Sequence, residues 1–179
     1  MLVRPTAVLL VSCAAFAAGG LVGAAPASAG TSCVPPPVAH RGDSARAPEN
    51  TLPAFRKALG VGARRVELDV RFTMGDVPVV MHDPTVDRTT NGTGEVSAMT
   101  LEQVRALDAG SWFGRAYRGT KVPTLYEALS VAKGRGAGVM VELKMLPTAS
   151  QLAQFLDRVR RLAMARSVVV TSFDGPTLT

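Results

Sequence analysis

Short apolar runs alternate with helix-like segments along most of this chain. Between the first two runs, Ala54, Phe55, Ala58 and Leu59 recur with helical spacing. The runs that read as strands lie at 38–40, 65–70, 78–82, 139–144 and 167–173. Strands that alternate with helices predict one α/β domain built on a parallel sheet or barrel.

Capping sequences mark where the helices should begin. The segment Asn50-Thr51-Leu52-Pro53 is typical of a helix start, with a capping residue and a proline in the first turn. The segments Thr100-Leu101-Glu102-Gln103 and Thr124-Leu125-Tyr126-Glu127 both fit the capping-box pattern. An amphipathic helix is expected over 148–165, and the polar, glycine-rich stretch 83–96 is typical of an ordered functional loop.

The N-terminal 29 residues have the features of a secretory signal peptide. Arg4 is followed by an uncharged apolar run, and Ala27-Ser28-Ala29 forms a small-residue cleavage signal. We therefore expect a secreted protein with no transmembrane anchor after cleavage. Residues 30–37 are a proline-rich linker, and 38–179 form the folded domain. Cleavage would leave Cys33 as the sole cysteine, which is unusual in an oxidising compartment.

Charge adds little to this picture. The formal net charge is +6 for the 179 residues. The basic residues are scattered and are not interleaved with aromatic ones, which argues against nucleic acid as a partner. A mild preference for small anionic substrates remains, and the sequence indicates no oligomeric state.

Candidate chemistry gathers where the predicted strands end. In parallel α/β folds the carboxyl ends of the strands carry the site. Converging carboxylates repel one another unless a cation binds, and oxygen ligands favour Ca²⁺ or Mg²⁺. Two histidines on different strands can supply a general acid and a general base. The residues at or next to these ends are His40, Glu67, Asp69, His82, Glu142 and Lys144.

Each element also has a structural interpretation. A single histidine after a strand often makes only a backbone hydrogen bond, and Glu142 with Lys144 could be a buried ion pair that contacts no ligand. Glu67 and Asp69 could form the polar face of a half-exposed strand. Their joint occurrence on successive strands favours the catalytic interpretation.

Several motifs, taken in order, resemble the glycerophosphodiester phosphodiesterase family. The segments that carry the resemblance are Ala39-His40-Arg41-Gly42, Pro48-Glu49-Asn50-Thr51-Leu52-Pro53-Ala54-Phe55, Val66-Glu67-Leu68-Asp69-Val70, Val79-Val80-Met81-His82-Asp83, Asp87-Arg88-Thr89-Thr90-Asn91-Gly92-Thr93-Gly94, Val122-Pro123-Thr124-Leu125 and Val141-Glu142-Leu143-Lys144. The resemblance implies a TIM-type (β/α)8 barrel of the phosphatidylinositol-phosphodiesterase-like kind. It also implies hydrolysis of small-molecule glycerophosphodiesters to sn-glycerol 3-phosphate and an alcohol.

The resemblance also assigns roles to individual residues. His40 and His82 match the acid/base pair, and Arg41 and Lys144 match basic residues near the phosphate. The divalent-metal ligands are matched by three carboxylates, those of Glu67, Asp69 and Glu142. The stretch 83–121 corresponds to a small inserted segment that covers the site.

The resemblance leads us to expect only about the first five β/α units of the barrel, since a closed barrel typically needs about 250 residues. A chain of this length, produced as written, should then be poorly stable and inactive, with Val168, Val169 and Val170 forming an unpaired apolar edge. Two alternatives to the glycerophosphodiesterase function are a phospholipase D or sphingomyelinase D type of lipid phosphodiesterase, and a non-catalytic homologue.

Overall fold

The computed structural model describes residues 37–172, so the predicted signal peptide, nearly all of the linker and Cys33 lie outside the described residues. Within them, no helix is both long enough and apolar enough to cross a membrane. The elements, in chain order, are β1 (Val38–Ala39), α1 (Leu52–Gly60), β2 (Arg65–Phe72), β3 (Pro78–Val80), the 3-10 turn η1 (Val96–Ala98), α2 (Leu101–Ala106), the 3-10 turn η2 (Arg115–Tyr117), α3 (Leu125–Lys133), β4 (Gly138–Leu143), α4 (Ala149–Arg161) and β5 (Val168–Thr171).

Four strands form a parallel sheet in the order β1-β2-β4-β5. The register aligns their starts: Val38 lies beside Arg65, and Arg65 beside Gly138. Glu142 lies beside Asp69 at the other end of the sheet. This confirms the predicted parallel α/β architecture and puts the carboxyl ends of the strands at one edge.

The prediction of five β/α units was wrong at β3, because that strand is antiparallel to β2. Its pairing sets Val80 against Val70 and Pro78 against Phe72. Only residues 73–77 separate the two strands, closed by a hydrogen bond from Thr73 N to Val77 O. A crossover to a parallel strand needs a dozen residues or more, so this connection can form only a hairpin. The described residues therefore hold four parallel strands.

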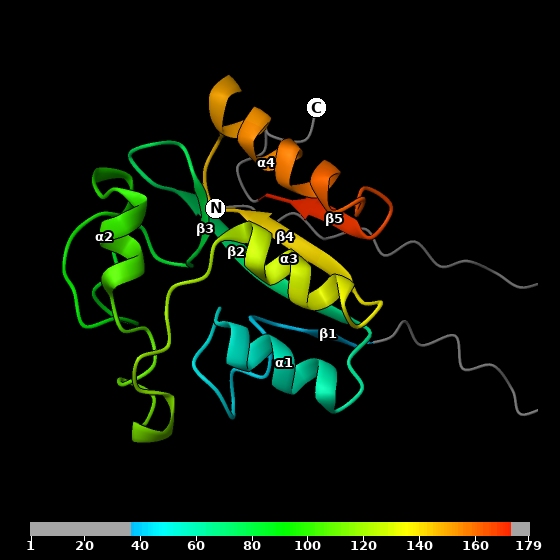
Figure 1. Ribbon diagram of the computed structural model, residues 1–179, viewed down its shortest axis with the longest axis horizontal. Coiled ribbons are helices and arrows are strands. Elements are labelled where there is room, and N and C mark those ends of the chain that lie inside the picture. The colour runs from blue at the N-terminus through cyan, green and yellow to red at the C-terminus, as the bar shows by residue number, and fades with distance from the viewer. Residues whose placement is uncertain (1–36, 173–179) are drawn as a thin grey trace, which may run out of the picture. The chain divides into compact units, whose positions relative to one another are not determined.

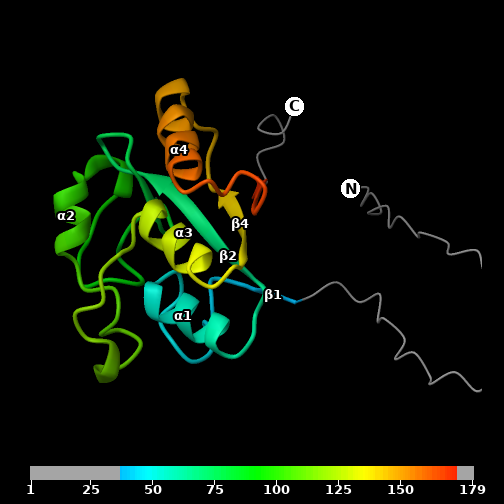
Figure 2. The same cartoon turned by 45° about the vertical axis from the view of Figure 1, so that its right-hand side comes forward.

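The helices α1, α3 and α4 lie together on one face of the sheet (Figure 1, Figure 2). The side chains of β2 alternate: Val66, Leu68 and Val70 are fully buried in the core beneath the helices. Glu67 and Asp69 therefore point to the opposite face, as the two-residue period of a strand requires. The face of the sheet beneath the helices is apolar, and the two carboxylates lie on the opposite face.

The predicted helix starts are confirmed. Thr51 caps α1, and both expected capping boxes are present, at Thr100 for α2 and at Thr124 for α3. A third capping box, at Thr148, opens α4. Each reciprocal pair satisfies backbone donors that would otherwise lack partners in the first turn of the helix.

Residues 81–122, between β3 and α3, include the predicted inserted segment and have a small core of their own. This core is built from residues of β3, the insertion and its return, namely Val79, Met81, Val86, Val96, Val104, Ala109 and Val122. The chain leaves and rejoins the sheet at one place, because Val80 N donates to Pro123 O at 2.8 Å. Val79 also forms an isolated bridge with Thr124.

Candidate active site

Three carboxylates meet at the carboxyl end of the sheet. Glu67 and Asp69 come from β2 and Glu142 from β4, and one oxygen of each lies within 4.8 Å of the others. Glu67 and Asp69 are buried. Glu67 Oε1 and Asp69 Oδ1 are buried without a hydrogen-bond partner. Buried, unsatisfied carboxylate oxygens are costly, so the arrangement is suited to a bound cation.

Proton affinity gives the same indication. Burial, together with the nearby charges of Asp69 and Glu142, raises the pKa of Glu67 to about 7, and the backbone hydrogen bond from Arg41 acts against this shift. Like charges in a shared site oppose ionisation, whereas a divalent cation favours it. The all-oxygen donor set and this repulsion together fit a hard divalent ion.

Two cations lie against this cluster. Lys144 Nζ is 2.5 Å from Glu142 Oε1 and 3.5 Å from Asp69 Oδ1. Arg41 Nε is 3.2 Å from Asp69 Oδ2, and its backbone N–H donates to Glu67 Oε2 at 2.7 Å. Arg41 adopts the left-handed backbone conformation with φ of 56°, which turns its amide towards the carboxylate. The two predicted phosphate-binding cations thus lie at the cluster.

Asn50 fills the gap along the edge of β2 between β1 and β3. Its side-chain amide donates to Asp69 Oδ2 at 2.7 Å, and its oxygen accepts from the backbone N–H of Asp69 at 3.2 Å. Asn50 is also left-handed, with φ of 57°, a conformation that asparagine tolerates better than most residues. This buried pair fixes the carboxylate of Asp69.

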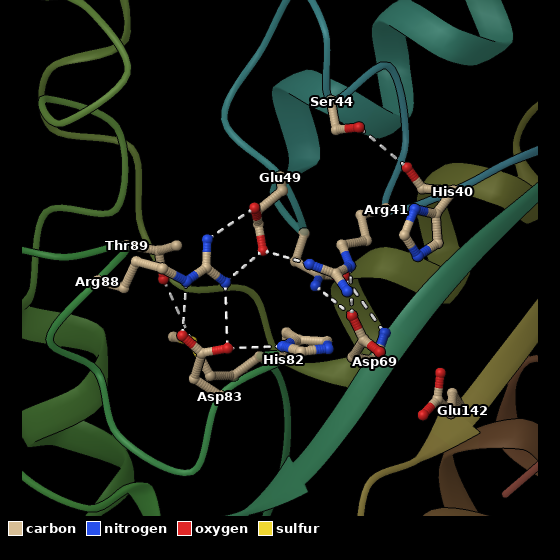
Figure 3. A network of polar contacts seen from close by, with 12 residues as sticks. His40, Arg41, Ser44, Glu49, Asp69, His82, Asp83, Arg88, Thr89 and Glu142 are labelled. Atoms are coloured by element: carbon tan, nitrogen blue, oxygen red, sulfur yellow. Dashed lines mark hydrogen bonds and ion pairs between the residues drawn. The ribbon is translucent and has the colours of Figure 1, made fainter. Parts of the chain in front are cut away.

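His40 follows β1 and stands at the open side of the cluster. Its Nε2 is 4.0 Å from Glu67 Oε2, and its side chain is 67% exposed. Ser44 Oγ donates to the His40 carbonyl oxygen at 3.2 Å. The imidazole is therefore accessible to a ligand while its backbone is held by the loop after β1 (Figure 3).

His82 reaches the same region from the opposite direction, two residues after the antiparallel β3 ends at Val80. Met81 N donates to Asp69 O at 3.0 Å, which brings the next residue, His82, beside the cluster. The expectation that His82 ends a parallel strand was wrong, but its position near the carboxylates holds. A hairpin from β2 delivers it there.

An ion-pair network holds the imidazole of His82 (Figure 3). His82 Nδ1 lies 2.6 Å from Asp83 Oδ1, and Arg88 Nε donates to Asp83 Oδ2 at 2.6 Å. The two terminal nitrogens of Arg88 donate to both oxygens of Glu49, at 2.8 and 2.9 Å. Glu49 accepts in turn from Arg41 at 3.0 Å. The network thereby links the two histidine-bearing segments.

These contacts shift the pKa values of Asp83, Glu49 and Arg88 so that each side chain keeps its charge. The Arg88 hydrogen bond holds the pKa of Asp83 and that of Glu49 below their ordinary values. Its bonds to Glu49 and Asp83 raise the pKa of Arg88 itself. The carboxylate beside His82 is therefore ionised throughout the neutral range.

Arg71 is a third cation that faces the site. It follows Asp69 by two residues on β2, and its Nε donates to the carbonyl oxygen of His82 at 2.8 Å. Burial lowers the pKa of Arg71, and the charges of Asp83, Asp69 and Glu142 act against that shift. The hydrogen bond from Arg71 thus connects the backbone of His82 to β2.

The structure brings together all the residues that the sequence singled out. The sequence-based interpretation assigned no role to the four residues that support them, Glu49, Asn50, Asp83 and Arg88. Asn50 and Glu49 lie in the loop before α1, and a Pro-Glu-Asn-Thr run at a helix start reads as capping sequence alone. Pairings such as Arg88 with Glu49, which lie 39 positions apart, have no periodic signal in the sequence.

Comparison with known proteins gives a family match. Residues 40–178 match the model of the glycerophosphoryl diester phosphodiesterase family. A glycerophosphodiester phosphodiesterase of Caldanaerobacter subterraneus is 40% identical over 145 residues, which cover 79% of this chain and 59% of that protein. The human glycerophosphodiester phosphodiesterase 1 is 45% identical over 109 residues, 60% of this chain and 33% of the human protein.

Solved structures agree. A glycerophosphodiester phosphodiesterase from Agrobacterium tumefaciens shares 44% identity with a TM-score of 0.72, over 78% of this chain and 58% of that one. An Oleispira antarctica phosphodiesterase, solved with the product sn-glycerol-3-phosphate, shares 35% identity with a TM-score of 0.73, over 79% and 58%. The chain thus spans less than two thirds of the length of these relatives.

Proposed function

The chain belongs to the glycerophosphoryl diester phosphodiesterase family, and on that premise we propose that the protein hydrolyses glycerophosphodiesters to sn-glycerol 3-phosphate and an alcohol. The observation that carries the proposal is the placement of two histidines, His40 and His82, beside one cluster of three carboxylates. The product bound in the Oleispira antarctica relative supports the same substrate class.

The two imidazoles are proposed to move the protons of the reaction. One removes the proton of the attacking oxygen as the P–O bond forms, and the other protonates the alkoxide that leaves as the second P–O bond breaks. Asp83 holds His82 through Nδ1, which leaves Nε2 free to face the substrate.

The anionic phosphodiester is proposed to bind between the carboxylate cluster and its cations. Lys144 and Arg41 contact Asp69 at the cluster, so their donors flank the position where a phosphate would meet it. Glu67, Asp69 and Glu142 would hold a divalent cation, Ca²⁺ or Mg²⁺, which would neutralise the phosphodiester charge and orient the attacking oxygen. Calorimetry with each ion would decide between the two.

The test is hydrolysis of glycerophosphocholine by the purified protein. His40→Ala and His82→Ala should each lower kcat at least about a hundredfold, the usual contribution of a general acid or base. Partial recovery with added imidazole would separate lost chemistry from lost folding. Near wild-type turnover in either variant would contradict the proposal, and sphingomyelin cleavage without glycerophosphocholine cleavage would favour the lipid phosphodiesterase alternative.

We also propose that the protein is exported, on the strength of the signal-peptide pattern of residues 1–29. N-terminal sequencing of the protein recovered from culture medium should find Gly30 first. Recovery only from the cell interior, with Met1 retained, would contradict export.

A further inference from the structure

The end of the sheet opposite the active site is rich in unpaired cations. The helices α1, α3 and α4 all finish there, and the connections to β2, β4 and β5 follow (Figure 1). The register of the parallel strands sets Val66, Val139 and Val168 in one row, so the three connections that lead into these strands are neighbours. We call the exposed cations of this region the basic end: Lys57, Arg64, Lys133, Arg135, Arg160 and Arg166.

Nothing in the described residues neutralises this basic end. Its six members make no ion pair within residues 37–172. In the last helical turns and connections of this end, as far as the structure describes them, no residue is acidic. Asp157, one turn earlier on α4, is engaged by Arg158 and Arg161. The site carboxylates are too far away to compensate, because Arg65 to Asp69 spans roughly 13 Å of strand and charges are screened over about 8 Å.

Helix dipoles explain only part of the basic end. Cations in a last turn, such as Lys57 and Lys133, favourably oppose the partial negative charge of the helix terminus. Arg64, Arg135 and Arg166 lie beyond the helices, one in each connection, where that stabilisation fades. A repeated cation in three neighbouring connections therefore requires a different explanation.

Exposed apolar side chains accompany these cations. Val61, the residue that caps the C-terminus of α1, is 71% exposed, and Val38 at the start of β1 is 37% exposed. The register places Val38 beside Arg65, at the same end. Among the described residues no aromatic side chain lies in these connections, so the stacking platform used to bind single-stranded nucleic acid is missing there. Cations around an exposed aliphatic group are typical of proteins that lie on a lipid surface.

We propose that the basic end docks the protein on an anionic phospholipid membrane. Lys and Arg side chains near such a surface are attracted by its negative potential, and Val61 adds a small apolar contact at the headgroup level. The docking needs no catalytic residue and goes beyond the proposed function. If that function holds, the docked molecule turns its active site towards water, which suits a water-soluble diester and not an intact lipid.

The experiment is co-sedimentation of the exported form, which begins at Gly30, with phosphatidylcholine vesicles that contain or lack phosphatidylglycerol. The triple variant Arg64→Gln, Arg135→Gln, Arg160→Gln should lose on the order of 100-fold in partitioning to the anionic vesicles, since each basic residue contributes a factor of about five. Val61→Ser should lose a few-fold at most. Wild type and triple variant should bind equally weakly to pure phosphatidylcholine.

The matched control removes the same charge elsewhere, in Arg115→Gln, Arg118→Gln, Lys121→Gln, and should change partitioning only a few-fold. Equal loss in the control would reduce the effect to net charge and overturn the proposal, as would wild-type binding that does not depend on phosphatidylglycerol. The proposal would also be overturned if the wild type bound single-stranded DNA but not the vesicles, and if the triple variant lost that DNA binding. Circular dichroism checks folding, and the single variant Arg64→Gln replaces the triple variant if that one is unfolded.

Discussion

Two groups of acidic side chains meet near the carboxyl end of the sheet, and their charges are balanced in different ways. The carboxylates of Glu67, Asp69 and Glu142 crowd one another, and two of their buried oxygens lack a hydrogen-bond partner. By contrast, Asp83 and Glu49 are bridged by the guanidinium of Arg88. Arg41 and Lys144 lie against the first group but leave these oxygens without a hydrogen bond, so the group suits a further cation from outside the chain. The second group is balanced by its own Arg88. One arrangement serves binding and the other serves positioning.

The comparison is tested most strongly by Asp69→Asn, which removes the central charge of the first group. We expect affinity for a divalent ion to fall by more than about 100-fold, beyond the roughly 10–100-fold effect of losing an outer-shell partner. Isothermal titration calorimetry measures the affinity for the divalent ion. The matched control is Asp87→Asn, an exposed carboxylate outside both groups, which should bind as wild type does. Unchanged affinity in Asp69→Asn would show that these carboxylates do not form the metal site.

A second test, Arg88→Gln, breaks the other group. Asp83 and Glu49 would lose their shared cation, and Asp83 would no longer be held against His82 Nδ1. We expect kcat for glycerophosphocholine to fall about 10–100-fold through the loss of His82 orientation, with metal affinity within a few-fold of wild type. Arg118→Gln, an exposed arginine outside the network, is the control. If Arg88→Gln lowered metal affinity as much as it lowered kcat, the two groups would not have separate roles in binding and positioning.

A third test uses pH. The pKa of Glu67 is raised to about 7, so a proton competes with the divalent ion, and apparent affinity should rise about tenfold per pH unit up to that value and then level off. Without the ion, the folded state binds more protons than the unfolded state between about pH 4.5 and 7, so the free energy of unfolding should fall as pH rises through that window. Glu67→Gln should flatten both profiles, and a persistent slope in this variant would assign the titration to another group.

The smallest expected effect comes from Glu49→Gln. Glu49 accepts from both Arg88 and Arg41, but Arg88 keeps Asp83 as a partner. Ion pairs of this partly exposed kind contribute about 1 kcal/mol or less. The free energy of unfolding, measured by thermal denaturation, should therefore fall by that amount, and the affinity for the divalent ion should equal that of the wild type. A loss of several kcal/mol would mean that Glu49, and not Arg88, organises the second group.

Much of this site could be predicted from sequence because strand periodicity decides which side chains share a face. Glu67 and Asp69 are two positions apart on β2, and Glu142 lies beside Asp69 by register. Helix starts were equally readable, because a capping box is a local pattern in which the side chains and the backbone groups they satisfy are three residues apart.

The rest depended on geometry that the pattern of apolar residues does not carry. An apolar run such as 78–82 looks the same in a parallel or an antiparallel strand, and only the short connection 73–77 distinguishes them. The second acidic group joins loop residues from before α1 and after β3. Its members are paired by three-dimensional proximity and follow no period.

The contact between Val80 and Pro123 has a consequence for how this protein can vary. Because residues 81–122 leave and return at one point of the sheet, the ends of the segment are already closed, and doubling its length would add only about 0.6 kcal/mol of closure entropy. The segment can therefore differ in length and sequence between related proteins while the sheet stays the same. A replacement segment would have to keep Asp83 and Arg88, without which His82 is released. It would also have to replace the bonds that Met99 and Arg105 make outside the segment, to Met74 N and to Glu127.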